Sequence, residues 1–275
     1  MSKVWFITGT SRGFGREFAR AALGRGDRVA ATARDTTSLA DLVQDFGDAV
    51  LPLSLDVTDR AAVGAAVSAA VEQFGRLDVV VNNAGYGLFG AVEEITEQQL
   101  RDQLEVNLFG VLHVTQAVLP VLRRQGFGHV VQISTIGGVA AFPTLGGYHA
   151  SKWALEGLTE SLAQEVAHLG IKVTLVEPGA FATDWATSSA VHADPMPAYD
   201  PVRQAMAERG AEAGDAAVGD PRGAGRALLT VVDADEPPLR VLFGSQPTHI
   251  APAVYRSRLE TWERWNHVSV AADGR

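Results

Sequence analysis

Short apolar segments rich in β-branched residues recur along this chain, and longer segments with helical periodicity lie between them. Apolar and polar residues do not alternate within these segments, so we expect strands buried on both faces of a sheet. The expected strands span residues 4–8, 28–32, 49–54, 77–82, 129–134, 172–177 and 240–244. Strands joined through helices form right-handed parallel crossovers. The sequence therefore predicts an α/β fold, a doubly wound parallel sheet of about seven strands with helices on both faces.

The segments between the expected strands predict helices over residues 15–24, 36–46, 59–74, 96–124, 148–168 and 220–234. Thr96 followed by Gln99 is a capping-box pattern, which supports a helix start there. No cluster of proline and glycine divides the first 180 residues, so we expect one domain over residues 1–275. Periodicity is weak over 178–225, which predicts a long loop that is either functional or mobile. We expect residues 180–225 to form a substrate-side loop and helical insertion, and 245–267 a C-terminal helical extension.

Composition excludes several classes of function. The chain has 23 Lys and Arg against 32 Asp and Glu, a net charge of −9, and no basic patch, so we expect no nucleic-acid partner. It has no cysteine, and its 7 histidines lack metal-ligand spacing, so we expect neither disulfides nor a metal site. No run of 18 apolar residues and no signal-peptide core occur, so we expect a cytoplasmic protein without a membrane partner.

The first expected strand leads into the sequence TGTSRGFG, residues 8–15, and then into a helix. Glycines at 9, 13 and 15 permit a tight turn, close approach of backbone N–H groups to a pyrophosphate, and packing of helix on strand. A tight turn alone can also demand glycine. The position between first strand and first helix favours a dinucleotide site.

The edge of the second expected strand bears on cofactor choice. An acid there binds the ribose 2′-hydroxyl of NAD, whereas an arginine binds the 2′-phosphate of NADP. Asp35 lies 20 residues after Gly15, the spacing of an NAD site. However, Arg34 leaves the strand first, Arg12 is a second cation in the glycine loop, and Asp35 can serve as a helix N-cap. We therefore predict a preference for NADP(H), with NAD(H) possible.

Polar side chains follow the third and fourth expected strands, at the edge where ligands bind in open α/β sheets. Asp56 and Val57 follow the third strand, and Asn83, Ala84 and Gly85 follow the fourth. Asp56 can also simply cap a helix, and the Asn83–Gly85 segment can be a plain turn.

Tyr148 and Lys152 stand four residues apart in an expected helix, so they share one face. A nearby cation favours the phenolate and lowers the pKa of a tyrosine from about 10 toward the range useful in acid–base catalysis. Such pairs also arise on ordinary amphipathic helices.

The motifs TGTSRGFG, NNAG and YHASK stand in this chain in the order and spacing of the classical short-chain dehydrogenases/reductases, and residues 3–180 resemble that family. The resemblance implies a Rossmann-type domain that binds NAD(P)(H) and transfers hydride to or from a carbonyl carbon. It implies that Tyr148 is the general acid or base and that Lys152 holds the nicotinamide ribose and lowers the pKa of Tyr148. Asn107 would position a water that relays protons to Lys152.

The resemblance also implies a set of cofactor contacts. These comprise Gly9, Ser11, Arg12, Gly13, Phe14, Gly15, Arg34, Asp56, Val57, Asn83, Ala84, Gly85, Tyr148, Lys152, Pro178, Gly179 and Thr183. The family's carbonyl-orienting serine lies 13 residues before the tyrosine, which is Thr135 in this chain, and Ser134 is its neighbour. Consecutive strand residues point to opposite faces, so only one of the two can face the site, and the register favours Thr135.

Two sets of aromatic and apolar residues lie outside these motifs, one in the long loop and one in the last helix. Within the long loop, apolar side chains either line a substrate pocket or pack the loop itself: Phe181, Trp185, Met196 and Tyr199. Trp262 and Trp265 in the last helix pack against the body or against another subunit.

The segment ATARD and the long tail resemble the hydroxysteroid and retinol dehydrogenase branch, which favours a bulky apolar substrate. We expect a homodimer or homotetramer.

The favoured function is NADP(H)-dependent, reversible reduction of a small-molecule ketone or aldehyde to an alcohol. One alternative is an NAD-dependent alcohol dehydrogenase, and another is a non-catalytic, dinucleotide-sensing regulator on the same fold. A serine hydrolase is disfavoured because no G-x-S-x-G elbow occurs.

Overall fold

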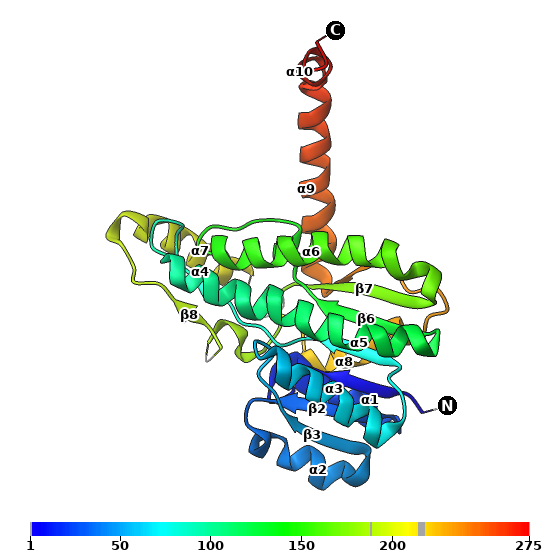
Figure 1. The fold of residues 1–275 in the computed structure, drawn as a ribbon. Coiled ribbons are helices and arrows are strands. Elements are labelled where there is room, and N and C mark those ends of the chain that lie inside the picture. The colour runs from blue at the N-terminus through cyan, green and yellow to red at the C-terminus, as the bar shows by residue number, and fades with distance from the viewer. Residues whose placement is uncertain (1, 188, 214–217, 275) are drawn as a thin grey trace.

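A computed structural model describes residues 2–187, 189–213 and 218–274 of the chain. Its main sheet has seven strands, all paired in parallel, in the order β3-β2-β1-β4-β6-β7-β9 (Figure 1). The strands are β1 Val4–Ile7, β2 Arg28–Ala33, β3 Val50–Ser54, β4 Val79–Asn82, β6 Gly128–Ile133, β7 Ile171–Pro178 and β9 Arg240–Phe243. The predicted doubly wound parallel sheet is confirmed, and each predicted strand boundary lies within two residues of the observed one.

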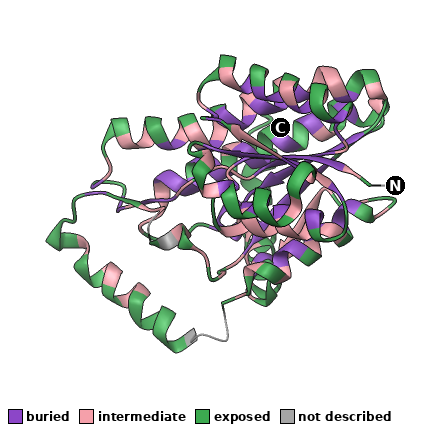
Figure 2. Cartoon of the chain, turned by 90° about the horizontal axis from the view of Figure 1, so that it is seen from below, coloured by how far each residue is buried: buried purple, intermediate pink, exposed green. Residues whose placement is uncertain are grey.

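Helices cover both faces of this sheet. One face packs under α1 (Gly13–Gly24), α2 (Ala40–Phe46) and α8 (Pro221–Asp233), and the other under α3 (Arg60–Phe74), α5 (Val111–Gln125) and α6 (Gly146–Val166). Successive strand residues supply the two cores in turn, as Trp5 and Ile7 do for the first and Val4 and Phe6 for the second. The strands form a buried layer between the helices (Figure 2). The sequence read as unbroken apolar runs because both strand faces are covered.

Two predicted helices are subdivided. The first turn of the expected 36–46 helix is the 3₁₀ segment η1, Thr36–Leu39, and the expected 96–124 helix consists of α4 (Glu97–Leu104), the π-helical turn η3 (Glu105–Gly110) and α5. By length and composition the continuous segment Glu97–Gln125 is apolar enough to cross a membrane. Its α5 part packs on the sheet together with α3, so we interpret the segment as a core helix.

The predicted loop 178–225 contains more structure than its weak periodicity indicates; its residues 188 and 214–217 lie outside the described part. It holds short segments η6 (Asp184–Ala186) and η7 (Pro197–Tyr199), strand β8 (Val191–His192), which pairs with β5 (Leu88–Phe89), and helix α7 (Asp200–Ala213). The buried Glu94 carboxylate accepts hydrogen bonds from Arg203 of α7 at 2.6 Å and from the backbone of Ala91 and Met196, each at 2.7 Å. These donors lower the pKa of Glu94 to about 2, so a carboxylate anchors the insertion.

After β9 the chain is helical over a longer range than residues 245–267. Helix α9 (Ser245–Arg264) and the short helix α10 (Asn266–Ala271) form an arm that projects away from the body (Figure 1). Trp262 and Trp265 are 63 % and 56 % exposed, so they do not pack against the described part of the body.

Candidate active site

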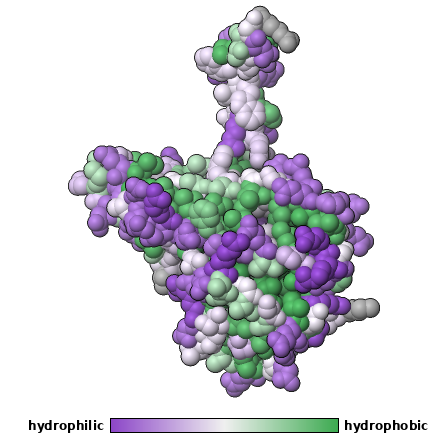
Figure 3. All heavy atoms as spheres, in the orientation of Figure 1, coloured by the Kyte–Doolittle hydropathy of each residue, from purple (hydrophilic) through white to green (hydrophobic). Residues whose placement is uncertain are grey.

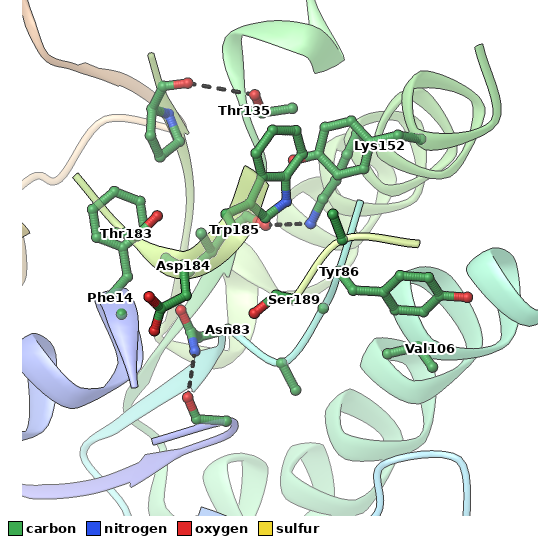
Figure 4. Close-up of a pocket in the computed structure, with 18 of the residues that line it drawn as sticks. Phe14, Asn83, Tyr86, Val106, Thr135, Lys152, Thr183, Asp184, Trp185 and Ser189 are labelled. Carbon is green, nitrogen blue, oxygen red and sulfur yellow. Dashed lines mark hydrogen bonds between the residues drawn. The ribbon is translucent and has the colours of Figure 1, made fainter. Parts of the chain in front are cut away.

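A cleft of about 740 Å³ lies at the carboxyl edge of the sheet, where the loops after β1, β2, β3, β4, β6 and β7 converge (Figure 4). Strand order reverses beside β1, where β1 and β4 are neighbours, so crossovers run away from this point in both directions. Ligands of open α/β sheets bind at such an edge. Of the predicted site residues, all but Gly15 and Asn107 line the cleft.

The glycine loop is shaped by backbone conformations that favour glycine. Gly9 and Gly13 have φ of 68° and 57°. A Cβ on Gly15 would lie 2.3 Å from the Gly9 carbonyl oxygen, so Gly15 permits helix α1 to pack on the loop rather than lining the cleft. Arg12 is the N-cap of α1, and it lines the cleft together with Gly13 and Phe14 of the first turn, where the N–H groups and the dipole of a helix favour a phosphate. This loop fits the pyrophosphate of a dinucleotide.

Asn83 fastens the glycine loop to the end of β4. Its Nδ2 donates to the carbonyl oxygens of Thr8 and Gly9, both at 2.9 Å, and the Thr8 hydroxyl accepts from the backbone N–H groups of Asn83 and Ala84 at 2.9 and 3.0 Å (Figure 4). The NNAG motif therefore holds two strand ends together, which is more than the plain turn that the sequence left open.

The second strand presents Arg34, and not Asp35, to the cleft. The Asp35 carboxylate accepts hydrogen bonds from the backbone N–H and the hydroxyl of Thr37, at 2.9 and 2.7 Å, and these bonds lower its pKa. Asp35 thus caps η1, the competing role predicted for it. Asp56 lines the cleft, and its pKa is lowered first by the backbone hydrogen bond from Thr58, with a smaller contribution from the charge of Arg34.

Tyr148 and Lys152 lie one turn apart on α6 and are both buried. Lys152 Nζ donates to the Ile133 carbonyl oxygen at 2.8 Å and lies 5.9 Å from the centroid of the Tyr148 ring. Burial lowers the pKa of Lys152 to about 8, and the charge of Glu156 opposes that shift.

Burial also raises the pKa of the Tyr148 phenol, and only the hydrogen bond with Thr135 opposes this. The direction is opposite to the lowering predicted from the Lys152 charge, because removal of the phenolate from water dominates. The buried phenol therefore stays protonated at neutral pH.

Thr135 and Ser134 point to different surroundings, as strand alternation predicts. Thr135 reaches the Tyr148 hydroxyl, accepts from the Gly137 N–H at 3.1 Å, and makes a long 3.4 Å hydrogen bond to the Pro178 carbonyl oxygen (Figure 4). The Ser134 side chain faces Glu156 on the underside of the site instead. Of the two hydroxyls, that of Thr135 is paired with the tyrosine.

Asn107 lies in the π-helical turn η3 and is fully buried outside the cleft lining. Its Oδ1 accepts from the Tyr86 N–H at 3.1 Å, and its Nδ2 donates to the Tyr86 carbonyl oxygen at 3.0 Å and to the Ser151 hydroxyl at 3.1 Å. The side chain thereby joins the segment after β4 to α6, one residue from Lys152.

The amino-acid sequence matches a known family along most of its length. Residues 3–193 match the family model described as short chain dehydrogenase. The chain belongs to the short-chain dehydrogenase family. It is therefore an oxidoreductase, consistent with 44 % identity over 273 residues to Oxidoreductase BOA17 of Botryotinia fuckeliana, spanning 99 % of this chain and 100 % of that protein.

Solved structures agree with this assignment. A short-chain dehydrogenase from Streptomyces avermitilis superposes with a TM-score of 0.92 at 40 % identity, over 98 % of both chains. An alcohol dehydrogenase from the archaeon Thermococcus sibiricus, complexed with 5-hydroxy-NADP, superposes with a TM-score of 0.73 at 30 % identity, over 89 % of this chain and 97 % of that chain.

Beside Tyr148, the cleft of this short-chain dehydrogenase is lined by aromatic residues. The Trp185 ring lies 4.9 Å from the Tyr148 ring and 5.2 Å from Phe89, centroid to centroid. Phe181 also lines the cleft but packs edge-on against Phe14 at 4.9 Å, toward the glycine loop. Met196 and Tyr199, the other two loop residues considered, are not among the lining residues.

The sequence reasoning missed several lining residues of this dehydrogenase. Among them are Tyr86, Phe142, Leu145, His149 and Val191. His149 is part of the YHASK motif, but it directly follows Tyr148, so helical spacing predicts that the two side chains lie on different faces of the helix. Burial lowers the pKa of His149 to about 4, so it lines the cleft as a neutral ring.

Proposed function

We propose that this dehydrogenase reduces a ketone or aldehyde to an alcohol, reversibly, with NADP(H) as the preferred cofactor. The observation that carries the proposal is the meeting of the Tyr148 and Thr135 hydroxyls, next to Lys152, in the same cleft as the glycine loop and the first turn of α1. The similarity to an alcohol dehydrogenase complexed with 5-hydroxy-NADP supports both the reaction and the cofactor.

The residues of the cleft fit a dinucleotide along its length. The glycine loop and the first turn of α1 would hold the pyrophosphate, Arg12 and Arg34 the 2′-phosphate, and Asp56 and Val57 the adenine side. The Asn83–Gly85 segment would flank the adenosine, and Lys152 the nicotinamide ribose. Pro178, Gly179 and Thr183, with Ser11 and Phe14, would complete the contacts. When bound, the reduced nicotinamide supplies a hydride to the carbonyl carbon.

Tyr148 provides the proton in this scheme. As the carbonyl oxygen gains negative charge, the Tyr148 hydroxyl donates its proton to that oxygen, and the Thr135 hydroxyl donates a second hydrogen bond that orients it. The raised pKa of the phenol suits an acid, because it keeps the proton in place until the oxygen becomes basic. The Lys152 ammonium stabilises the tyrosinate that remains.

Asn107 acts as a positioning residue in this proposal. Its bonds to Tyr86 and Ser151 fix the turn of α6 that carries Lys152. Relay of protons to Lys152 through a water positioned by Asn107 stays a prediction.

The substrate we propose is bulky and apolar, as in the hydroxysteroid and retinol dehydrogenase branch. Trp185 packs against Tyr148, Phe142, Leu145 and Val191 add apolar surface to the same cleft, and His149 is neutral there. We also propose that residues 180–225, as far as they are described, form the substrate-side insertion of one domain. A cytoplasmic homodimer or homotetramer remains our expectation.

A panel of ketones, aldehydes and alcohols tested with NADPH, NADH and their oxidised forms, read at the nicotinamide absorbance, tests the proposal. We expect turnover of apolar ketones with NADPH at a much higher kcat/KM than with NADH. Preference for NAD⁺ and an alcohol would favour the NAD-dependent alcohol dehydrogenase. Tight cofactor binding without turnover of any compound would favour the sensing regulator.

A further inference from the structure

The arm formed by α9 and α10 leaves much of its length uncovered. Every described residue from Leu259 to Gly274 is exposed, including Leu259, Trp262, Trp265, Val268 and Val270. In the space-filling view the arm stands clear of the body (Figure 3). Large apolar side chains at such density are unusual on a surface that faces only water.

The apolar residues of α9 continue a stripe that is buried at its base. Ala251 is buried, and Tyr255, Arg258, Trp262 and Trp265 follow it at spacings of four, three, four and three residues, which places them on one face. Near the body this face is covered, and the Arg258 guanidinium stacks on Trp153 of α6 at 4.9 Å. Beyond Arg258 the same face has no cover from the described residues.

The exposed area of the chain exceeds that of a compact monomer. A monomer of 29.1 kDa exposes about 11,400 Å² by the usual scaling with mass, whereas this chain exposes 13902 Å². The excess, about 2,500 Å², is larger than the roughly 800 Å² that each partner buries in a standard protein interface. Helix α7 is exposed too, but its exposed side chains are mostly polar or charged. The uncovered aromatic area lies on the arm.

We propose that the arm is a dimerisation element whose face of Tyr255, Trp262 and Trp265, flanked by Leu259, packs against a second copy of this chain. Tryptophan and tyrosine are the residues that most often carry the binding energy of an interface. On α6, Trp153 and Leu158 are also exposed, and Trp153 lies against Arg258 at the base of the arm. A copy docked on the α6 side lies within reach of the arm, and two-fold symmetry makes the contact reciprocal.

The charge on the arm favours a protein over a membrane as its partner. Its polar side chains include Arg256, Glu260, Glu263 and Arg264, of both signs, whereas helices that lie on anionic membranes carry a basic polar face. Residues of the arm also have a counterpart in the Streptomyces avermitilis structure, which aligns over 98 % of this chain.

The base of the arm supports the active-site loop. Ala251 and the partly buried Ile250 pack with Ile136, Val139 and Phe142, and Arg258 donates a 2.7 Å hydrogen bond to the Val139 carbonyl oxygen. Ile136 and Phe142 line the cleft, and Ile136 follows Thr135 directly. The base of the arm therefore packs, within the same chain, against the loop that carries Thr135.

The test is the mass of the native protein in solution as a function of concentration, measured by sedimentation, for the wild type and two double variants. Trp262→Ser with Trp265→Ser removes the aromatic face, and Glu260→Ser with Glu263→Ser is the matched control at exposed sites off the stripe centre. We expect the tryptophan variant to weaken assembly at least 100-fold while its thermal unfolding remains cooperative. We expect the control to assemble as the wild type does.

Three results would overturn the proposal. They are a wild type that is monomeric at micromolar concentration, a tryptophan variant that assembles with wild-type affinity, and an arm-dependent binding of the wild type to vesicles of neutral or anionic phospholipid in place of self-association. Each is independent of the proposed reaction, because none uses substrate or cofactor.

Discussion

At the scale of single residues, the chemistry depends on one phenol that burial keeps protonated. Tyr148 has its pKa raised by burial, and its hydrogen-bond partner is Thr135. Tyr148→Phe removes the proton donor and preserves the ring that packs against Trp185. We expect kcat to fall by about 10² to 10⁴, the usual contribution of a general acid. NADPH affinity, measured by fluorescence titration, should stay within a few-fold of wild type.

The two neighbouring hydroxyls at 134 and 135 should contribute unequally. Thr135→Val keeps the shape of the side chain but removes the hydroxyl that reaches Tyr148, so we expect a large loss of kcat. Ser134→Ala removes a hydroxyl that faces Glu156, so we expect a much smaller loss. Steady-state assays of the two variants side by side decide the matter, and the reverse order would assign carbonyl orientation to Ser134.

At the scale of elements, the edge of β2 and the glycine loop determine cofactor choice. Arg34 and Arg12 line the cleft, whereas Asp35 is bonded to Thr37 in η1. Two charge-assisted contacts to a 2′-phosphate provide about 2 to 4 kcal/mol of discrimination, or about 30-fold to several hundred-fold in affinity. Arg34→Ala should remove much of the preference for NADPH over NADH and Arg12→Ala part of the rest.

Titration of both reduced cofactors at fixed salt, followed by their fluorescence, measures this preference. Arg20→Ala is a suitable control, since that arginine is bonded to Asp41 and Asp45 and lies outside the cleft lining. Equal affinities of the wild type for NADPH and NADH, or tighter NADH, would show that the two arginines do not read the phosphate.

The elements that were predictable are those whose burial leaves a periodic pattern in the sequence. The inner strands of the main sheet are covered on both faces and left apolar runs, and the partly buried edge strands β3 and β9 are still mostly apolar. Helix α7 left none, because polar contacts such as the Arg203–Glu94 ion pair anchor it and it presents mostly polar residues to solvent. The π-helical turn around Asn107 was also hidden, since a single wider turn barely changes the apolar spacing.

The residues of the site, like the elements of the fold, were predictable only where a regular pattern places them. Residues at strand ends and on the Tyr148 helix were predictable, because the sheet topology brings strand ends to one edge. Residues such as Phe142 and Val191 reach the cleft through the path of irregular segments, which no local pattern encodes. The sequence left open whether Met196 and Tyr199 line the cleft or pack the loop; neither lines the cleft, and the Glu94 anchor holds the Met196 backbone outside it.

At the scale of the whole molecule, a buried charge cluster joins α6, β7 and β9 behind the site. Burial, followed by the nearby Glu156, raises the pKa of Glu177 to about 7, and Arg240 opposes the shift from 3.5 Å. The folded protein then binds a proton that the unfolded chain, with a carboxyl pKa of about 4.3, has lost. This contribution to stability is complete at low pH and is lost as pH rises toward 7.

Thermal unfolding of the wild type and Glu177→Gln at a series of pH values between 4.5 and 8 checks this link. The difference between the two melting curves isolates Glu177 from other titrating groups. We expect the wild type to lose stability relative to Glu177→Gln as pH rises. Glu160→Gln, at an exposed partner of Arg240, should keep the wild-type slope. Parallel curves for the wild type and Glu177→Gln would contradict the cluster's role.

The central claim, hydride transfer to a carbonyl with Tyr148 as acid, is tested most directly by following the transferred atom. The enzyme is incubated with an apolar ketone and NADPH deuterated at both C4 positions, and the product is analysed by mass spectrometry and NMR. We predict one deuterium on the carbinol carbon with the wild type and almost no product with Tyr148→Phe. Alcohol without deuterium at that carbon, or equal yields from the two proteins, would contradict the mechanism.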